Sequence, residues 1–230
     1  MPGLGAVFCD VGGPLYDDEN FVSAVLTALD ELRAADGLSP VDRQEFRQLY
    51  DGIRQTQGMS LRGELAETFL GDRSRRRELQ ERTKAYWVHP AGTLYADVLP
   101  FLRSLAGRVR FGILANQEEG VIRALERDGV APFVDVWGVS AVVGHEKPSA
   151  ALFDWCLDQA GIPAAQAVHI GNRLDNDVRP AHALGLATVW LLRGEAPDHP
   201  TDDQLAEADI TVGTLDGLAP RLFTLIESRG

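Results

Sequence analysis

The chain has 230 residues, 45% of them hydrophobic and 24% charged, which suits one α/β domain with a small accessory domain. Its net charge of −12 argues against a nucleic-acid partner, because binding to a phosphate backbone depends on lysine and arginine. Two cysteines are too few for a disulfide framework, and no apolar stretch could cross a bilayer. We expect a cytoplasmic protein with no signal peptide and no membrane partner.

The first segment predicts a buried strand that ends at a carboxylate. An apolar run over residues 4–10 delivers Asp10 to a turn formed by Gly12 and Gly13. A strand that ends in this way can aim a nucleophile at a ligand above a sheet. A second carboxylate two residues later could donate a proton, but Gly12 stands at that position.

Residues 20–88 contain no strand-like run and show helical periodicity instead. The apolar residues of the first stretch fall on one helix face: Phe21, Val22, Val25, Leu26, Leu29 and Leu32. Further amphipathic stretches follow near 41–55, 61–69 and 75–87, separated by glycine and proline. The last one begins in the densest basic cluster, Arg73 with Arg75 to Arg77, which we expect to be a solvated helix start.

From Ala91 onward, apolar strand candidates alternate with amphipathic stretches. The candidates are Val109–Leu114, Val134–Val139, Ala167–Ile170, Ala187–Leu192 and Asp209–Val212. This alternation predicts an α/β fold, a Rossmann-like parallel sheet with helices on both faces. The helical segment is then a cap inserted after the first strand, over the sheet edge where such folds bind ligands. We place the core domain at residues 1–18 and 90–230 and the cap at 19–89.

Polar residues and glycines gather in four segments, each at a predicted strand end or helix start. They are Asp10 with Gly12-Gly13, Ala115-Asn116-Gln117, Gly144 to Pro148, and Gly171 to Asp177. Carboxylates, amides, a lysine and glycine turns together suit a phosphate group and a hard divalent cation. Mg²⁺ takes oxygen ligands, and main-chain N–H groups freed by glycine turns can hold phosphate oxygens.

These four segments, in this order and spacing, resemble the motifs of the haloacid dehalogenase superfamily of hydrolases. Lys147-Pro148 followed by Phe153 is similar to the third motif. Gly171 to Asp177, followed by Ala181 and Gly185, is similar to the fourth. The helical insert resembles the C1-type cap of that superfamily. The resemblance covers nearly the whole chain and implies a Mg²⁺-dependent phosphatase of a small phosphorylated metabolite.

The resemblance also implies roles for single residues. Asp10 would be the nucleophile that becomes an aspartyl-phosphate, with one oxygen on Mg²⁺. The main-chain carbonyl of Gly12 would be a second metal ligand, and the Gly12-Gly13 turn would contact the phosphate. Asn116 would help to hold the phosphoryl group. Lys147 would be a catalytic, phosphate-binding cation that neutralises charge between Asp10 and the phosphate.

In the fourth motif, the resemblance implies a set of metal-binding residues. Asn172 takes the place of a metal-binding aspartate, and as an uncharged amide it should bind Mg²⁺ more weakly. Asp177 would support the metal ion or its waters, and Asp175 is a further candidate. Two other positions depart from the family pattern. Gly12 removes the usual general acid, a function worth about 10²–10⁴-fold in rate, and Ala115 removes a phosphate-binding hydroxyl.

Three functions stay open on the sequence alone. The leading one is the Mg²⁺-dependent phosphatase. The second is a metal-independent 2-haloacid dehalogenase, which also lacks the second carboxylate of the first motif and shares the Asn-x-x-Asp spacing of Asn172 and Asp175. The third is a slow or non-catalytic phosphate-binding protein on the same scaffold. Substrate specificity in capped enzymes of this kind lies in the cap, for which the sequence offers no transferable motif.

Overall fold

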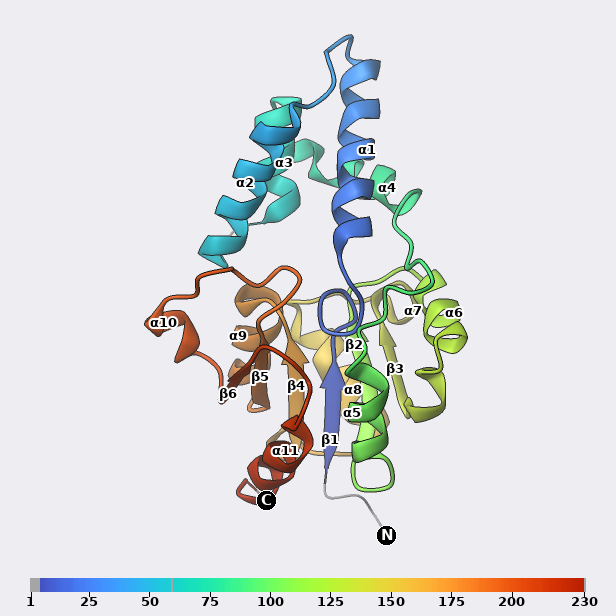
Figure 1. The fold of residues 1–230 in the computed structure, drawn as a ribbon, viewed down its shortest axis with the longest axis vertical. Coiled ribbons are helices and arrows are strands. Elements are labelled where there is room, and N and C mark those ends of the chain that lie inside the picture. The colour runs from blue at the N-terminus through green and yellow to red at the C-terminus, as the bar shows by residue number, and fades with distance from the viewer. Residues whose placement is uncertain (1–4, 59, 230) are drawn as a thin grey trace.

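The computed structural model describes residues 5–58 and 60–229, and over this range it contains a six-stranded parallel sheet (Figure 1). The strand order is β3-β2-β1-β4-β5-β6, with β1 in the interior of the sheet. The strands are β1 (Ala6–Cys9), β2 (Arg110–Ala115), β3 (Val136–Val139), β4 (Ala167–Gly171), β5 (Ala187–Leu191) and β6 (Ile210–Val212). The predicted parallel α/β fold is confirmed.

All six predicted strands are present, with ends that differ by one or two residues; residue 4 of the first prediction lies outside the described range. Their near-continuous apolar character follows from burial on both faces of the sheet. In β1, Val7 and Cys9 join one hydrophobic cluster, whereas Ala6 and Phe8 join another. This alternation is the two-residue period of a strand between two helical layers.

Helices cover both faces of the sheet. The cluster that holds Val7 also includes residues of α5 (Val98–Leu105), α6 (Gly120–Arg127) and α11 (Leu218–Glu227). The cluster that holds Phe8 includes α8 (Ala150–Ala160) and α9 (Arg179–Ala183). Two short helices, α7 (Ser140–Val143) and α10 (Asp202–Leu205), lie in the connections. Among the described residues, no helix combines the length and apolar character needed to cross a membrane.

Four helices form a separate layer above the strand ends (Figure 1). They are α1 (Glu19–Ala35), α2 (Arg43–Thr56), α3 (Leu61–Leu70) and α4 (Arg76–Lys84). They share a hydrophobic cluster of their own, and the side chains of Asp42 and Ser60 cap the starts of α2 and α3. We propose residues 19–89 as the limits of this cap.

Gln57 joins the cap to the core just after α2. It is buried, adopts a left-handed conformation (φ +50°), and makes three hydrogen bonds to the core. Its Oε1 accepts the N–H of Leu174 at 2.9 Å, and its Nε2 donates to the carbonyl of Glu195 at 2.9 Å. Its own carbonyl accepts a bond from Arg179 at 2.7 Å. One residue therefore fixes the end of α2 to two separate core loops.

Candidate active site

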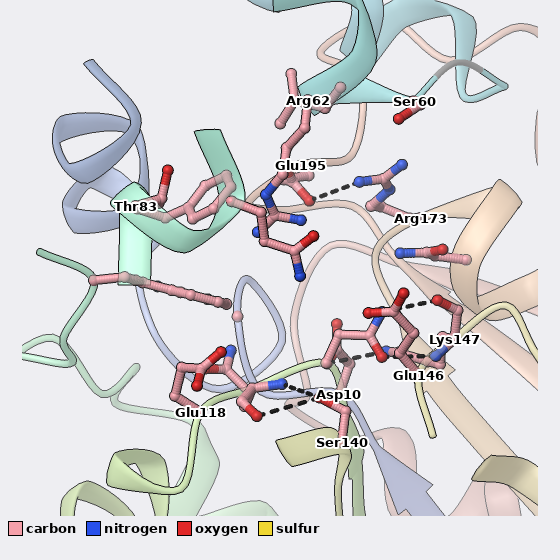
Figure 2. A pocket seen from close by; sticks show the side chains of 18 of the residues that line it. Asp10, Ser60, Arg62, Thr83, Glu118, Ser140, Glu146, Lys147, Arg173 and Glu195 are labelled. Atoms are coloured by element: carbon pink, nitrogen blue, oxygen red, sulfur yellow. Dashed lines mark hydrogen bonds and ion pairs between the residues drawn. The ribbon is translucent and has the colours of Figure 1, made fainter. Parts of the chain in front are cut away.

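A cavity of about 510 Å³ lies between the cap and the carboxyl ends of the strands (Figure 2). Five predicted site residues line it: Asp10, Gly12, Asn116, Lys147 and Asp175. The other three are buried beside these lining residues: Gly13, Asn172 and Asp177. The parallel sheet thus brings the four sequence segments to one edge, although not every side chain opens into the cavity.

A row of three charged side chains forms the centre of the site. Lys147 Nζ lies 3.0 Å from Asp10 Oδ1 and 2.5 Å from Asp177 Oδ1. Lys147 and Asp177 are almost fully buried, whereas the Asp10 side chain keeps 16% of its surface exposed. Asp10 is therefore the carboxylate of this row that retains open surface for a ligand.

Burial and neighbouring charges set the ionisation of this row. Burial raises the pKa of Asp10 to about 6, against the opposing charge of Lys147. Burial also acts to raise the pKa of Asp177, but the charge of Lys147 and a hydrogen bond from His169 outweigh it and hold that pKa well below its usual range. Burial alone would lower the pKa of Lys147, yet the charges of Asp10 and Asp177 raise it. Lys147 is therefore a fixed cation beside Asp10.

Asp177 acts as the counter-ion of Lys147. Its Oδ1 contacts Lys147 and lies 3.1 Å from His169 Nε2, and its Oδ2 accepts the N–H of Arg173 at 3.1 Å. It belongs to η4 (Leu174–Val178), a π-helical turn that brings its carboxylate back to Arg173. These contacts engage both oxygens in hydrogen bonds, and a role of Asp177 in supporting the metal ion or its waters stays a prediction.

Asp175 is engaged in a similar way by Arg173. The Nε and Nη2 atoms of Arg173 donate to its two oxygens at 3.0 and 2.6 Å, a bidentate pair. Arg173 Nη1 also lies 3.3 Å from Glu195 Oε2. Figure 2 marks this ion pair with a dashed line. Although burial opposes it, the charges of Glu195 and Asp175 raise the pKa of Arg173. Asp175 therefore fixes the Arg173 guanidinium at the side of the cavity.

The amide of Asn116 clamps Lys147 rather than reaching freely into the cavity. It accepts the N–H of Lys147 at 2.7 Å and donates to the carbonyl of Lys147 at 2.9 Å. The next residue, Gln117, also lines the cavity, and its Nε2 lies 3.5 Å from the position of a Cβ on Gly12. Gln117 therefore offers an amide N–H close to Gly12, on a segment where Ala115 lacks a hydroxyl.

The two glycines of the first motif have different surroundings. Gly13 is in the left-handed region (φ +82°) and its N–H donates to the carbonyl of Tyr16 at 2.9 Å, so that group is not free for a phosphate. Gly12 lines the cavity and is not among the residues with positive φ. A Cβ on Gly12 would lie 2.9 Å from Asp18 Oδ1. The carboxylate of Asp18 thus fills the space that a side chain at position 12 would need.

Asp18 is a carboxylate without a structural task in helix capping. It stands at the N-cap position of α1, but its side chain makes no capping hydrogen bond. Burial, with the charges of Glu195 and Asp10, raises its pKa well above the usual range. Asp18 lines the same cavity as Asp10.

Asn172 faces the same small space from the end of β4, the strand next to β1. It is buried, and its Nδ2 donates to the carbonyl of Arg193 at 3.2 Å. A Cβ on Gly194 would meet both Asp18 Oδ2, at 2.6 Å, and Asn172 Nδ2, at 2.7 Å. An uncharged amide at position 172 is therefore compatible with a carboxylate at Asp18, whereas two carboxylates there would repel each other.

The donor atoms around Asp10 suit a hard divalent cation. The cavity residues Asp10, Asp18 and Gly12 carry carboxylate and main-chain oxygens of the type that Mg²⁺ prefers, whereas Asn172 directs its Nδ2 toward Gly13 and Asp18. Within residues 5–58 and 60–229, no group of three or more His, Cys, Asp or Glu side chains is placed to hold a metal ion. A cation here would depend on amide, main-chain and water oxygens as well, and Mg²⁺ commonly keeps several waters.

Residues 4–185 match the family model of the haloacid dehalogenase-like hydrolases. The chain belongs to this family of hydrolases. The sequence motifs named above are therefore the motifs of a haloacid dehalogenase-like hydrolase.

Curated relatives of this haloacid dehalogenase-like hydrolase include phosphatases. It is 33% identical over 112 residues to the glyceraldehyde 3-phosphate phosphatase of Methanocaldococcus jannaschii, covering 49% of this chain and 46% of that protein. It is 31% identical over 158 residues to the phosphoserine phosphatase of Thermus thermophilus, covering 66% and 54%. The chain spans about half the length of the curated relatives it matches.

Solved structures share the fold along the whole chain. A phosphatase of this family from Thermococcus onnurineus has a TM-score of 0.63 at 21% identity, covering 96% of this chain and 98% of that one. A 2-haloacid dehalogenase from Pseudomonas syringae has a TM-score of 0.59 at 20% identity, covering 97% and 99%. Since phosphatase and dehalogenase share this fold, the fold does not decide the reaction.

The sequence-based prediction gives no role to Asp18, Arg62 or His169, and it includes Gln117 only as part of the segment Ala115-Asn116-Gln117. Asp18 did carry a signal, because an acidic residue before a helix suggests a cap, and only the structure shows that no capping bond is made. His169 carried a signal too, as a polar residue within the buried run Val168 to Ile170. Arg62 lies in a segment whose pattern indicates only a helix.

Proposed function

We propose that this hydrolase cleaves phosphoric monoesters of small metabolites through a covalent intermediate on Asp10. The observation that carries the proposal is the ion pair between Asp10 and Lys147, at 3.0 Å, with Asp10 open to the cavity and Lys147 held by buried Asp177. A carboxylate fixed in this way is placed for attack on an electrophile bound above it. The phosphatase relatives support a phosphoryl group as that electrophile.

In the first half-reaction, an Asp10 oxygen attacks phosphorus and the bond from phosphorus to the ester oxygen breaks. Lys147 balances the negative charge that gathers between Asp10 and the phosphoryl oxygens. Gln117 Nε2 offers a hydrogen bond to the phosphoryl group, and Asn116 keeps Lys147 in position. In the second half-reaction, water attacks phosphorus, phosphate leaves and the Asp10 carboxylate is restored.

Asp18 supplies the second carboxylate that Gly12 lacks. Its Oδ1 occupies the space over Gly12, on the cavity side of the first motif. From there the protonated carboxyl of Asp18 donates its proton to the departing ester oxygen, and the carboxylate that results takes a proton from the attacking water.

We propose Mg²⁺ as the cofactor, held by Asp10, the carbonyl of Gly12, Asn172 and waters. When bound, it would neutralise phosphoryl charge and orient the substrate. Asp177 is left out of this ligand set because Lys147, His169 and Arg173 engage its oxygens.

The function is tested by a screen of phosphorylated metabolites and 2-chloropropionate, each with Mg²⁺ and with EDTA. Phosphate release that EDTA abolishes is the expected result. Halide release that is indifferent to EDTA would identify a dehalogenase instead. If neither product forms while phosphate esters still bind in calorimetry, the chain is a non-catalytic phosphate-binding protein.

Asn172→Asp is expected to lower the Mg²⁺ concentration needed for half-maximal activity by about tenfold, because an added carboxylate strengthens a site of hard oxygen ligands. The new charge lies close to Asp18, so the variant should be less stable without metal and gain more stability from Mg²⁺. The Mg²⁺-dependent rise in Tm is a readout that does not need turnover. Asn20→Asp, the same change outside the cavity, is the control. An unchanged Mg²⁺ requirement and Tm response would remove Asn172 from the metal ligands.

A further inference from the structure

We propose that the cap carries a binding site for a second anionic group of the substrate, built on Arg62. The inference rests on the proposed phosphatase function, since it names the substrate class for the same cavity. The substrate would be a small phosphoric monoester that also bears a carboxylate or a second phosphate. The phosphoryl group would lie at Asp10 and the second anion at the cap.

Arg62 is a half-buried cation that has no ion-pair partner among the described residues. It stands in the first turn of α3 and extends into the space between cap and core (Figure 2). Its Nε is buried without a hydrogen-bond partner among the described residues. Its guanidinium carbon lies 5.6 Å from the centre of the Phe21 ring. A buried N–H group without an acceptor is costly, and an anionic ligand in the cavity would supply that acceptor to Arg62 Nε.

The acidic residues around the cavity do not form an ion pair with the Arg62 guanidinium. The core side of the cavity is lined by Glu195, Glu118 and Glu146. None of their carboxylate oxygens lies within 4.0 Å of an Arg62 nitrogen, the distance of an ion pair. Glu195 is already paired with Arg173 at 3.3 Å. Burial is the main cause of a lowered pKa of Arg62, and the distant carboxylates offset it only in part.

The cap side of the cavity is basic as a whole. Arg76, Arg77 and Lys84 of α4 line it together with Arg62, and no acidic side chain from the cap helices does. Lys84 is paired with Glu118 at 3.4 Å, but no ion pair within 4.0 Å involves Arg76 or Arg77 among the described residues. In a chain with a net charge of −12, a basic surface facing a cavity is not a consequence of composition. Part of the predicted solvated helix start, Arg76 and Arg77, thus lies at the cavity.

The test compares ligand pairs that differ in one anionic group. Asp10→Asn serves as the background because it binds without turnover. Calorimetry then measures the Kd of 3-phosphoglycerate against glycerol 3-phosphate, and of fructose 1,6-bisphosphate against fructose 6-phosphate. We expect the doubly anionic member of at least one pair to bind about tenfold tighter or more, in line with a charged hydrogen bond. The first pair reports on a carboxylate and the second on a phosphate.

Adding Arg62→Gln to this background should reduce the ratio of the two Kd values, in the pair that shows a preference, to about one- to threefold. Arg62→Lys should keep part of the preference. Arg43→Gln removes the same charge from the cap outside the cavity and should leave the ratio unchanged. If Arg62→Gln fails to fold by circular dichroism, Arg62→Lys and the double variant Arg76→Gln/Arg77→Gln replace it, and each must lower the ratio.

Four outcomes decide between the proposals. The second anion site would be overturned by a Kd ratio near one in both ligand pairs, by no binding of any ligand, or by a ratio that does not depend on Arg62. The Arg62 guanidinium would then only pack on Phe21. A ratio that follows Arg62 in a chain that never releases phosphate would support this site while the phosphatase proposal fails.

Discussion

Replacing Asp10 by asparagine is expected to abolish turnover, with a loss of at least about 10³-fold in kcat, while leaving the fold intact. Asparagine keeps the size of the side chain but lacks the anionic oxygen that attacks phosphorus. Lys147 keeps its other partner, Asp177, so the buried row retains one ion pair. Tm should therefore stay within about 4 °C of the wild type.

Steady-state phosphate release checks the rate, and mass spectrometry after an acid quench checks for one added phosphoryl group on Asp10 in the wild type only. Asp154→Asn, an exposed position on α8, controls for preparation effects. Turnover of Asp10→Asn within tenfold of the wild type would exclude Asp10 as the nucleophile.

The second large effect concerns the carboxylate of Asp18. Asp18→Ala is expected to slow hydrolysis of alkyl phosphates by about 10²- to 10⁴-fold, because it removes the carboxylate that lies against Gly12. An aryl phosphate such as p-nitrophenyl phosphate needs less help with its leaving group and should lose less. Asp17→Asn, a neighbouring change that keeps the hydrogen bond to the N–H of Glu19, should have little effect.

A double-mutant cycle separates this role from a general loss of packing. Gly12→Asp alone should be less stable by about 1–3 kcal/mol, because its Cβ would lie 2.9 Å from Asp18 Oδ1 and its charge would repel that carboxylate. The double variant Gly12→Asp/Asp18→Ala should have more than ten times the activity of Asp18→Ala alone. Additive losses in the double variant would mean that positions 12 and 18 do not share one function.

The core was predictable because its signals are local. Six apolar runs between amphipathic stretches predicted the sheet, and a parallel sheet places all strand ends at one edge. That rule alone brings Asp10 and Lys147 into one neighbourhood. The individual roles of side chains were less predictable. Both Asn116 and Asp177 are in the predicted place, but their hydrogen bonds to Lys147 appear only when the loops are packed together.

The cap side of the site could not be predicted for a different reason. Helical periodicity identifies which residues of α3 and α4 are buried in the cap, but not how the cap is docked on the core. The direction of Arg62 and the position of Arg76 and Arg77 depend on that docking. Asp18 lies at the boundary between the two parts, so its function depends on both.

The position of Gln57 gives the cap a direct mechanical link to the fourth motif. One end of its side chain holds the N–H of Leu174, the first residue of the π-helical turn that carries Asp177, and the other holds the carbonyl of Glu195, the partner of Arg173. Any rotation that lifts the end of α2 must break these bonds before substrate can enter from that side. A neutral side chain therefore ties the end of α2 to the turn that carries the counter-ion of Lys147, while Arg54 and Gln55 tie the same helix to the loop around Ala196 and His199.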